Sequence, residues 1–553
     1  MTQTRTFLLI AWLVVAFLLW DAWQKDHHAP AAPTPASAQI DAAIPSSDDG
    51  SVPAPSDVPT ASALPDVPAV ENASTPGDTV VLANDVLRLT LDARGGTVLV
   101  AELLDYAQQP KGEKVPVQLL SQEPAHYFVA QNGLIGSVAP THEDAMTAQR
   151  GDQTLSEGSD AVELPFSWQG ANGVTVERRY TLERGSYLVK ISDTIRNDGA
   201  AAWSGQFVRV QPPALKGSFT NPASLSFVGA AWYSPQDKFE KLKFEDFASE
   251  PLRREVTDGW IAMLQHYFVA AIVPPKGEAA NFSNAVLSNG RFLMRELGSP
   301  LSIAPGSEAS TASQLYLGPK LRGDLEAISP GLSLTLDYGI FPVLAQPMHW
   351  LLSLLHTLTG NWGWAIVLLV VIIKAALFKL SEAQYKSFAK MRRVQPRIEA
   401  LKERYGDDRQ KFQVAMMEMY KKEKINPLGG CLPILVQIPI FLSLYWVLVE
   451  AVELRHAPWI LWIQNLTAPD PYFILPVVNL VTMWATQKLS PAPGMDPMQK
   501  KMMQAMPIVF GVMFAFFPAG LVLYWTTNGL LGLLQQWYIM RRHGEPAAAA
   551  SAK

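Results

Sequence analysis

The last third of the chain contains five long apolar segments, and they limit the fold more than any other feature of the sequence. A helix needs about 20 apolar residues to cross the roughly 30 Å hydrocarbon core of a bilayer. The third and fourth segments are short for a span, which favours local thinning of the bilayer. We predict membrane-spanning helices at residues 361–380, 429–452, 472–488, 502–518 and 519–540.

A sixth span is predicted at the N-terminus of the chain. Apolar residues 7–23 follow an arginine, a pattern that membrane anchors share with cleaved signal peptides. A signal peptide should end in small residues, whereas Trp20, Asp21 and Trp23 stand at that position. We therefore predict an uncleaved transmembrane anchor at residues 1–26.

The region between this anchor and the other spans has two parts of different composition. Residues 27–78 contain ten prolines and few large apolar residues, so they cannot bury enough surface to fold and are predicted to be a disordered linker. Residues 79–338 alternate apolar and polar side chains between Gly, Asn and Asp turns. This period of two is typical of antiparallel strands, and the length predicts a large β-sandwich.

The distribution of charge predicts the orientation in the membrane. The segment 381–428, counted with Lys379, carries thirteen Lys and Arg against seven Asp and Glu, whereas residues 453–471 contain one arginine and no lysine. By the positive-inside rule the basic segment is cytoplasmic and the second loop lies on the outer side of the membrane. The β-region is then on the outer side and both termini are cytoplasmic, as are the loop at 489–501 and the short tail at 541–553.

Residues 339–360 are predicted to form an amphipathic helix that lies in the outer interface of the membrane. Polar residues recur at steps of three or four, and leucines occupy the opposite face. We expect the polar face to lie towards water and lipid headgroups, and we prefer this strongly to a metal site. The polar positions are Gln346, His349, Ser353 and His356.

The basic segment 381–428 is predicted to fold as a helical hairpin that turns back at Gly406. Pro396 should kink the first arm or mark a helix start. The hairpin is either a solvated connector or a basic arm that meets a cytosolic partner, anionic lipid or a nascent chain. The apolar stripe comprises Met391, Val394, Ile398, Leu401 and Tyr405, followed by Phe412, Met416 and Met419.

Lys374 lies inside an apolar run, "VVIIKAALFKL", where a cation costs about 2.5–3.5 kcal/mol on insertion scales. Its stem could stretch towards the cytoplasmic surface, or its ammonium could face a wet cavity between helices. Polar residues of the other spans could line such a groove, although each alone is ordinary contact between helices. They are Gln437, Ser443, Asn479, Thr482, Thr526, Thr527, Asn528 and Gln535.

Two spans are interrupted by proline and rich in Met and Phe: "CLPILVQIPIFLSLYW" and "MMQAMPIVFGVMFAFFPAG". Such flexible surfaces suit varied apolar ligands, although core packing is the simpler explanation for any single side chain. No catalytic motif is present, and Cys431 is the only cysteine. We therefore predict neither enzymatic activity nor a cofactor nor a metal site, and the net charge of −5 gives no indication of nucleic-acid binding.

Several long motifs closely resemble the YidC family of membrane protein insertases from bacteria with two membranes. They include "GNWGWAIVLLVVIIK", "AKMRRVQPRIEALKERYGDD", "EKINPLGGCLPILVQIPIFLSLYWVL", "DPMQKKMMQAMPIVF" and "FPAGLVLYWTTNGLLGLLQQ". The resemblance covers essentially the whole chain. It implies a polytopic α-helical membrane protein with six transmembrane helices, a five-helix insertase core and a periplasmic β-supersandwich similar to sugar mutarotases.

The resemblance also implies a function and its residues. The family's cytoplasm-open groove carries a cation, usually arginine, whose position falls on Lys374, and a common tyrosine falls on Trp525. Implied partners are nascent membrane-protein clients, the Sec translocon with its accessory subunits, and a ribosome or targeting factor at the hairpin. The client is expected to slide along Ile438, Pro439, Met506, Phe510 and Met513.

Two alternative functions remain open from the sequence. A secondary transporter would also have polar residues within its spans, but it should show internal repeats around a midplane site, and none is visible. A membrane-anchored periplasmic protein that binds or processes carbohydrate would fit the β-region. That function would leave the basic hairpin and five spans unexplained.

Overall fold

A computed structural model describes residues 78–110, 112–136, 138–211, 227–287, 290–405, 408–423, 432–489 and 497–543. The chain divides into two units between residues 67 and 68, and only the second contains described residues. The predicted anchor at 1–26 and the linker at 27–78, apart from its last residue, lie outside the described residues.

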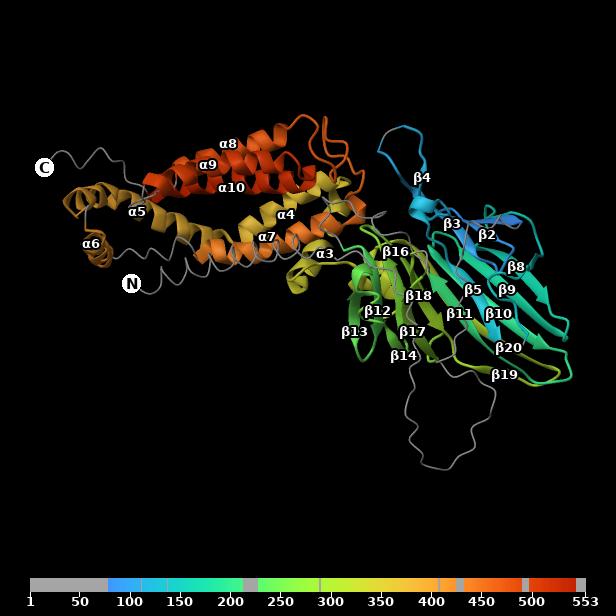
Figure 1. Cartoon of the computed structure of the whole chain (residues 1–553). Helices are drawn as coiled ribbons and strands as arrows, with labels where there is room; N and C mark the ends of the chain where they lie inside the picture. The colour runs from blue at the N-terminus through green and yellow to red at the C-terminus, as the bar shows by residue number, and fades with distance from the viewer. Residues whose placement is uncertain are drawn as a thin grey trace, which may run out of the picture. The chain divides into compact units, whose positions relative to one another are not determined.

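The N-terminal half of the described chain is built from β-strands in three sheets (Figure 1). The five-stranded sheet has the order β4-β3-β2-β1-β7, with bounds Pro116–Leu120, Val98–Ala107, Leu87–Asp92, Thr79–Ala83 and Gln153–Thr154. The nine-stranded sheet has the order β13-β12-β15-β16-β20-β10-β9-β8-β6, with bounds Lys238–Leu242, Gly229–Ser234, Trp260–Leu264, Phe268–Val273, Ser307–Pro319, Leu188–Asn197, Val174–Glu183, Ala161–Gln169 and Thr147–Ala148. The six-stranded sheet has β14-β17-β18-β11-β19, with β5 also paired to β11, and its bounds are Arg253–Thr257, Ala279–Val286, Phe292–Leu297, Trp203–Gln211, Leu301–Ile303 and Gln131–Gly136.

Strands β9 and β10 follow the alternating pattern from which they were predicted, whereas β15 and β16 are buried along their whole length. In β9 every second side chain is buried, and in the antiparallel partner β10 the buried positions again alternate. Because successive side chains of a strand point to opposite faces, this pattern gives each strand one inward face. Trp203 and Trp260 are among the largest fully buried side chains. The β-rich character predicted for this region is confirmed, and the strands form three sheets.

Four buried charges join the sheets to one another. Arg178 of β9 donates from Nε to Asp193 of β10 at 2.6 Å and from Nη1 to the carbonyl of Gly95, which precedes β3, at 2.7 Å. Arg209 of β11 donates to Glu296 of β18 at 2.9 Å and lies 3.9 Å from Asp193. Two guanidinium groups thus face two carboxylates, which is how a core tolerates charge.

The C-terminal half is helical. Helices α8, α9 and α10 run alongside one another, and α10 also packs on α4 and α5 (Figure 1). The short 3₁₀ helices are η1 (Pro124–His126), η2 (Phe244–Asp246), η3 (Leu332–Thr335) and η5 (Val452–Leu454). The α-helices are α2 (Arg322–Ile328), α3 (Pro342–Thr359), α4 (Trp362–Ala376), α5 (Phe378–Tyr405), α6 (Arg409–Lys422), α7 (Leu432–Glu450), α8 (Ile474–Leu489), α9 (Pro497–Phe514) and α10 (Ala519–His543).

The segment 361–380, predicted as one span, is divided between two helices. It forms α4 and the first residues of α5, and the two helices meet at Leu377 with a bend of 67°. By length and composition, no single helix among the described residues would cross a bilayer, whereas α4 and α5 together pass that test. The sequence did not reveal the bend because neither proline nor glycine marks it, and hydropathy alone does not encode helix direction.

Helices α5 and α6 form a pair within the basic segment. Asp408 caps α6 by accepting from the amide of Lys411 at 3.1 Å, and α5 continues through Pro396. The helices pack through an apolar cluster, whereas the predicted stripe members Leu401 and Tyr405 lie outside it. The cluster comprises Met391, Val394, Ile398 and Tyr420, with Phe388, Phe412, Met416 and Met419 at its edge.

Helix α3 buries one of its four polar residues. His349 is buried, with Nε2 3.7 Å from Glu453, whereas Gln346, Ser353 and His356 are half-buried and His356 stacks on Trp362 at 3.9 Å between ring centroids. The other buried side chains of this helix are apolar. A helical wheel could not show that Glu453 lies beside His349, and the placement of the helix at the membrane surface stays a prediction. The exposed side chains of α3 are mainly apolar and include Val343, Trp350, Leu354 and Leu358.

Candidate functional site

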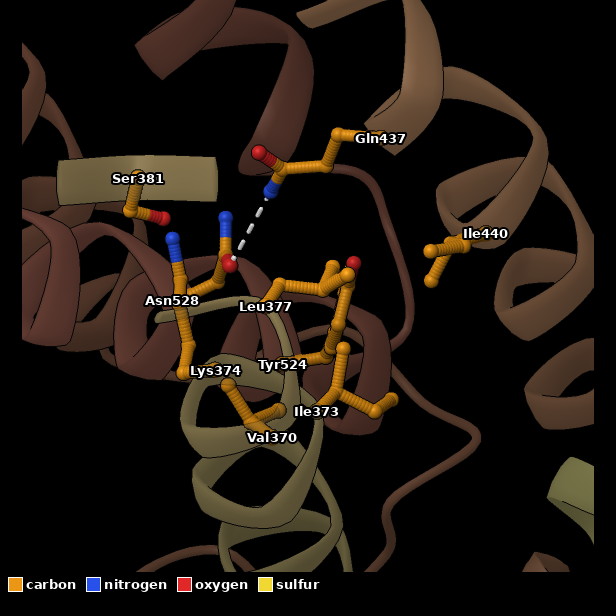
Figure 2. A pocket seen from close by; sticks show the side chains of 9 residues that line it. All are labelled: Val370, Ile373, Lys374, Leu377, Ser381, Gln437, Ile440, Tyr524 and Asn528. Atoms are coloured by element: carbon orange, nitrogen blue, oxygen red, sulfur yellow. Dashed lines mark hydrogen bonds between the residues drawn. The ribbon is translucent and has the colours of Figure 1, made fainter. Parts of the chain in front are cut away.

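Lys374 lies in a pocket at the point where four helices meet (Figure 2). Helix α4 contributes three lining residues, Leu377 lies at the bend, and α5, α7 and α10 contribute the rest. The pocket contains about 330 Å³ of empty space, including open solvent at its mouth. The lining comprises Val370, Ile373, Lys374, Leu377, Ser381, Gln437, Ile440, Tyr524 and Asn528.

A hydrogen bond crosses the pocket between two of the predicted polar residues. The Nε2 of Gln437 on α7 donates to the Oδ1 of Asn528 on α10 at 3.2 Å (Figure 2). Two helices far apart in sequence therefore meet at the pocket through side-chain amides, in addition to the packing of Phe441 on Tyr524 and Trp525. Each amide keeps further donor and acceptor capacity after making this bond, which makes the surface suitable for water or a polar chain.

Lys374 is the one charged residue in the pocket lining. Within the described part of the chain, no carboxylate lies within ion-pair distance of its ammonium group. A methyl group placed on Gly532 of α10 would lie 3.6 Å from both the Lys374 Nζ and the Tyr385 hydroxyl, so the two polar groups converge above this glycine. A cation in such a site interacts with water and with polar groups that enter from outside.

Gln535 is the third predicted polar residue near this lysine. Its side-chain nitrogen approaches the backbone carbonyl of Lys374 at 3.5 Å. Asn528, Gly532 and Gln535 are spaced by four and three residues along α10, so they share one face of that helix. This face of α10 forms the wall of the pocket opposite α4.

The other predicted polar residues lie between helices and do not line this pocket. Ser443 and Thr482 are buried and bond to carbonyls of their own helices, those of Pro439 at 2.7 Å and Val478 at 2.8 Å. The hydroxyl of Thr526 reaches the carbonyl of Leu475 at 3.5 Å. Asn479 is buried beside a methionine sulfur, and Thr527 is half-buried. These residues make contacts within and between helices, and they are not part of the pocket lining.

Sequence reasoning missed two residues of this region. The Tyr385 hydroxyl donates to the carbonyl of Gly532 at 3.1 Å, yet this tyrosine lies in a segment whose basic charge drew attention instead. Ser381 lines the pocket because α5 begins immediately after the bend. The signal available in the sequence was an aromatic residue within an otherwise basic segment, and the structure shows that Tyr385 is buried.

The expected client-contacting residues are divided between exposed and half-buried positions. Ile438 of α7 and Met506 of α9 are exposed, whereas Pro439, Phe510 and Met513 are half-buried. Phe510 stacks on Phe514 at 6.1 Å between ring centroids. The exposed side chains on α9 also include Ile508, Val509 and Val512.

Comparison with known proteins assigns the chain to a family. Residues 354–546 match the family described as 60Kd inner membrane protein, and residues 79–351 match the YidC periplasmic domain. A membrane protein insertase YidC of Stenotrophomonas maltophilia (strain R551-3) is 50% identical over 100% of this chain and 99% of its own length. The chain belongs to the YidC family of membrane protein insertases.

One further relative within the YidC family agrees. A membrane protein insertase YidC of Xanthomonas campestris pv. campestris (strain ATCC 33913) is 50% identical over 99% of this chain and 98% of its own length. A crystal structure of an active YidC insertase with its first transmembrane domain resolved covers 84% of this chain and 94% of its own, with 20% identity and a TM-score of 0.39.

Membership of the YidC family sets the general architecture and class of activity. The β-rich region is the family's periplasmic domain, and the helical region belongs to an inner-membrane insertase and chaperone that is not an enzyme. Secondary transport and carbohydrate processing, the two alternatives from the sequence, are not favoured by these relatives.

Proposed function

We propose that this protein carries polar segments of nascent membrane proteins across the inner membrane through the pocket around Lys374. The observation that supports the proposal most strongly is a lysine without a carboxylate partner among the described residues, held where α4, α5, α7 and α10 meet. The energetic barrier to insertion is the transfer of polar and charged residues through hydrocarbon. A hydrated groove reaching part-way into the bilayer shortens that transfer.

The topology that goes with this function has six spans and a periplasmic β-rich domain. The spans are 1–26, 361–380, 429–452, 472–488, 502–518 and 519–540. The hairpin at 381–428, the loop at 489–501 and both termini are cytoplasmic, and the loop at 453–471 is periplasmic. The charge difference between the hairpin and the periplasmic loop supports this orientation.

Lys374 should attract acidic or polar client segments transiently. Its ammonium is a point charge with three rotatable donors, whereas the arginine usual in the family presents a planar fork that can bind a carboxylate through two bonds. Attraction therefore depends on charge and not on a fixed geometry. The apolar part of the client would meanwhile pass along the exposed side chains of α7 and α9, including Ile438 and Met506, into lipid.

The partners follow from this mechanism. The client is a nascent membrane protein that arrives from a ribosome or a targeting factor, and the basic α5–α6 hairpin is the surface we assign to that delivery. Insertion proceeds alone or together with the Sec translocon and its accessory subunits.

Photo-crosslinking during translation tests the path of the client. A photoreactive residue at Ile438 or Met513 should crosslink to the transmembrane segment of a stalled client, and one at Val286, an exposed residue of the β-rich domain, should not. Equal crosslinking at Val286 would refute the proposed path.

Substitution of the lysine tests the role of charge. Lys374→Arg should retain insertion, whereas Lys374→Glu should impair clients with acidic periplasmic segments. Lys379→Glu changes net charge by the same amount at a side chain that is 92% exposed, and it is the matched control. Full insertion of acidic clients by Lys374→Glu would contradict the attraction model.

A further inference from the structure

Two bulky apolar residues in the segment between α7 and α8 have left-handed backbone conformations. Leu461 has φ of 53° and Phe473, directly before α8, has φ of 57°. Such values are unusual for large side chains because the Cβ crowds the backbone, and they persist only where the surroundings enforce them. Leu461 is nevertheless 73% exposed and Phe473 50% exposed. In water, both the backbone conformation and the exposure of each residue would be unfavourable.

The segment that carries Leu461 is packed firmly on α4. A Cβ on Gly363 would lie 2.1 Å from the Trp459 indole, so only glycine permits this contact. The Asn361 amide, at the start of α4, donates to the carbonyls of Pro458 at 3.3 Å and Trp459 at 3.1 Å. The exposure of Leu461 is therefore not that of a loosely held loop.

One buried carboxylate connects the turn of Leu461 to that of Phe473. Asp470 is 1% exposed and accepts from the Trp462 indole nitrogen at 2.9 Å. It also accepts from the backbone amides of Tyr472 at 3.0 Å and Leu475 at 2.8 Å. Asp470 thereby fixes the residue after Leu461 and residues on both sides of Phe473, so the two side chains are presented by the same scaffold.

Phe473 begins a continuous row of exposed apolar side chains on α8. The row follows helical spacing along one face and ends at Trp484, over which the Lys488 ammonium lies at 5.2 Å from the ring centroid. Trp and Lys at the end of an apolar row are typical of a membrane–water boundary. The exposed row comprises Ile474, Val477, Val481 and Trp484.

The length of this row shows why its outer end needs an anchor. From Phe473 to Lys488 a helix rises about 22 Å, which is shorter than the roughly 30 Å hydrocarbon core of a typical bilayer. A short span can sink into the membrane or pull the lipid surface down towards its ends. Apolar side chains fixed at the outer boundary would determine which of these occurs.

We propose that Leu461 and Phe473 insert into the outer leaflet of the inner membrane, among the acyl chains just below the headgroups. They hold the outer end of α8 at a set depth in the bilayer. This inference rests on the membrane topology proposed above. Continuity with the exposed row of α8 identifies lipid as the occupant of this surface, in preference to a protein partner.

Spin-label depth measurements on the full-length protein test this placement. Cys431→Ser provides the background for single labels at L461C, F473C, V481C and V115C in vesicles of phosphatidylethanolamine and phosphatidylglycerol. Labels at 461 and 473 should relax faster with lipid-soluble oxygen than with an aqueous nickel chelate, and the label at exposed Val115 of the β-rich domain should show the reverse.

The label at 481 separates failure of this inference from failure of the proposed topology. Lipid contact at 481 with aqueous labels at 461 and 473 would overturn the anchor but leave the topology intact. An aqueous label at 481 would overturn both. Shielding of 461 and 473 only after addition of purified Sec translocon would show that a protein occupies this surface, and it would also overturn the anchor.

Asparagine substitutions separate anchoring from structural support. Asn tolerates the left-handed region, so Leu461→Asn and Phe473→Asn remove apolar surface without adding backbone strain. The double variant should keep the wild-type thermal midpoint, while a label at V477C shifts towards aqueous accessibility. Val115→Asn is the matched control and should not move that label. An unchanged depth at 477 in the double variant would refute the anchor.

Discussion

The buried ion pair between Arg178 and Asp193 provides the sharpest prediction for the β-rich domain. Both side chains are at most 2% exposed and their atoms lie 2.6 Å apart. Asp193→Asn keeps the shape of the side chain but removes its charge. Arg209 would keep the carboxylate of Glu296, whereas Arg178 would lose the charge of Asp193, which leaves one uncompensated positive charge in the core.

Breaking a buried pair by neutralising one partner costs about 3–5 kcal/mol. For a domain of this size each kcal/mol lowers the melting temperature by about 2–4 °C, so we expect a decrease of about 6–20 °C. Thermal unfolding of the full-length protein in detergent, followed by near-ultraviolet circular dichroism, measures this decrease. The signal includes the fully buried Trp203 and Trp260 of the same domain.

Asp198→Asn is the matched control for this substitution. Asp198 pairs with Arg196 at 2.9 Å, but the two side chains are 49% and 63% exposed, and exposed pairs contribute only about 0–1 kcal/mol. A melting temperature for Asp193→Asn within the range of this control would refute the reasoning. The double variant Arg178→Met with Asp193→Leu removes both charges and should be more stable than Asp193→Asn. If it were no more stable, the unpaired charge would not be the cause of the loss, which would also refute the reasoning.

Three further substitutions test the helical region. Gly532→Ala should be tolerated, because the space beside Lys374 accepts one methyl group at 3.6 Å. Gly532→Val should reduce insertion of acidic clients, because overpacking costs about 1–3 kcal/mol. An in vitro insertion assay compares the two variants. Ile398→Ala should open the α5–α6 pair, since truncating a buried isoleucine costs about 2–5 kcal/mol, and limited proteolysis should cleave the hairpin faster than in Val414→Ala, an exposed position. Burial lowers the pKa of His349 against the opposing effect of Glu453, so the folded state resists protonation and the stability should fall as the pH decreases below about 6.5. His349→Gln should weaken this pH dependence of the melting temperature. His126→Gln, at an exposed histidine, is the control and should not weaken it.

Periodicity and hydropathy predicted which segments form strands and helices better than they predicted what each segment packs against. The alternation in β9 and β10 and the apolar stripe of the hairpin follow from spacing within one segment, which the sequence displays directly. The buried His349 of α3 has Glu453 beside it, more than a hundred residues later, and no marker residue stands at the bend at Leu377. These features are set by contacts between segments, which spacing within a segment does not encode.

The candidate site shows the same division between local and long-range information. Lys374 was identifiable because a lone cation in an apolar run needs an explanation, and Gln437 and Asn528 do lie beside it. Ser443 and Thr482 looked equally suitable in sequence, yet each bonds to the carbonyl four residues earlier in its own helix. A hydroxyl can satisfy itself on its own helix, whereas the longer side chains of Gln and Asn reach across to another helix.

Helix α10 therefore has two faces that contain polar residues for different reasons. Thr526 approaches the Leu475 carbonyl, and a Cβ on Gly529 would lie 3.0 Å from Thr482, so this face is closed against α8. Asn528 and Gly532 belong to the other face, which meets the cation of α4. The contacts with α8 hold α10 in place and leave the polar side chains of the second face to the pocket. In the proposed mechanism the client enters on that second side while the packed face keeps α10 fixed.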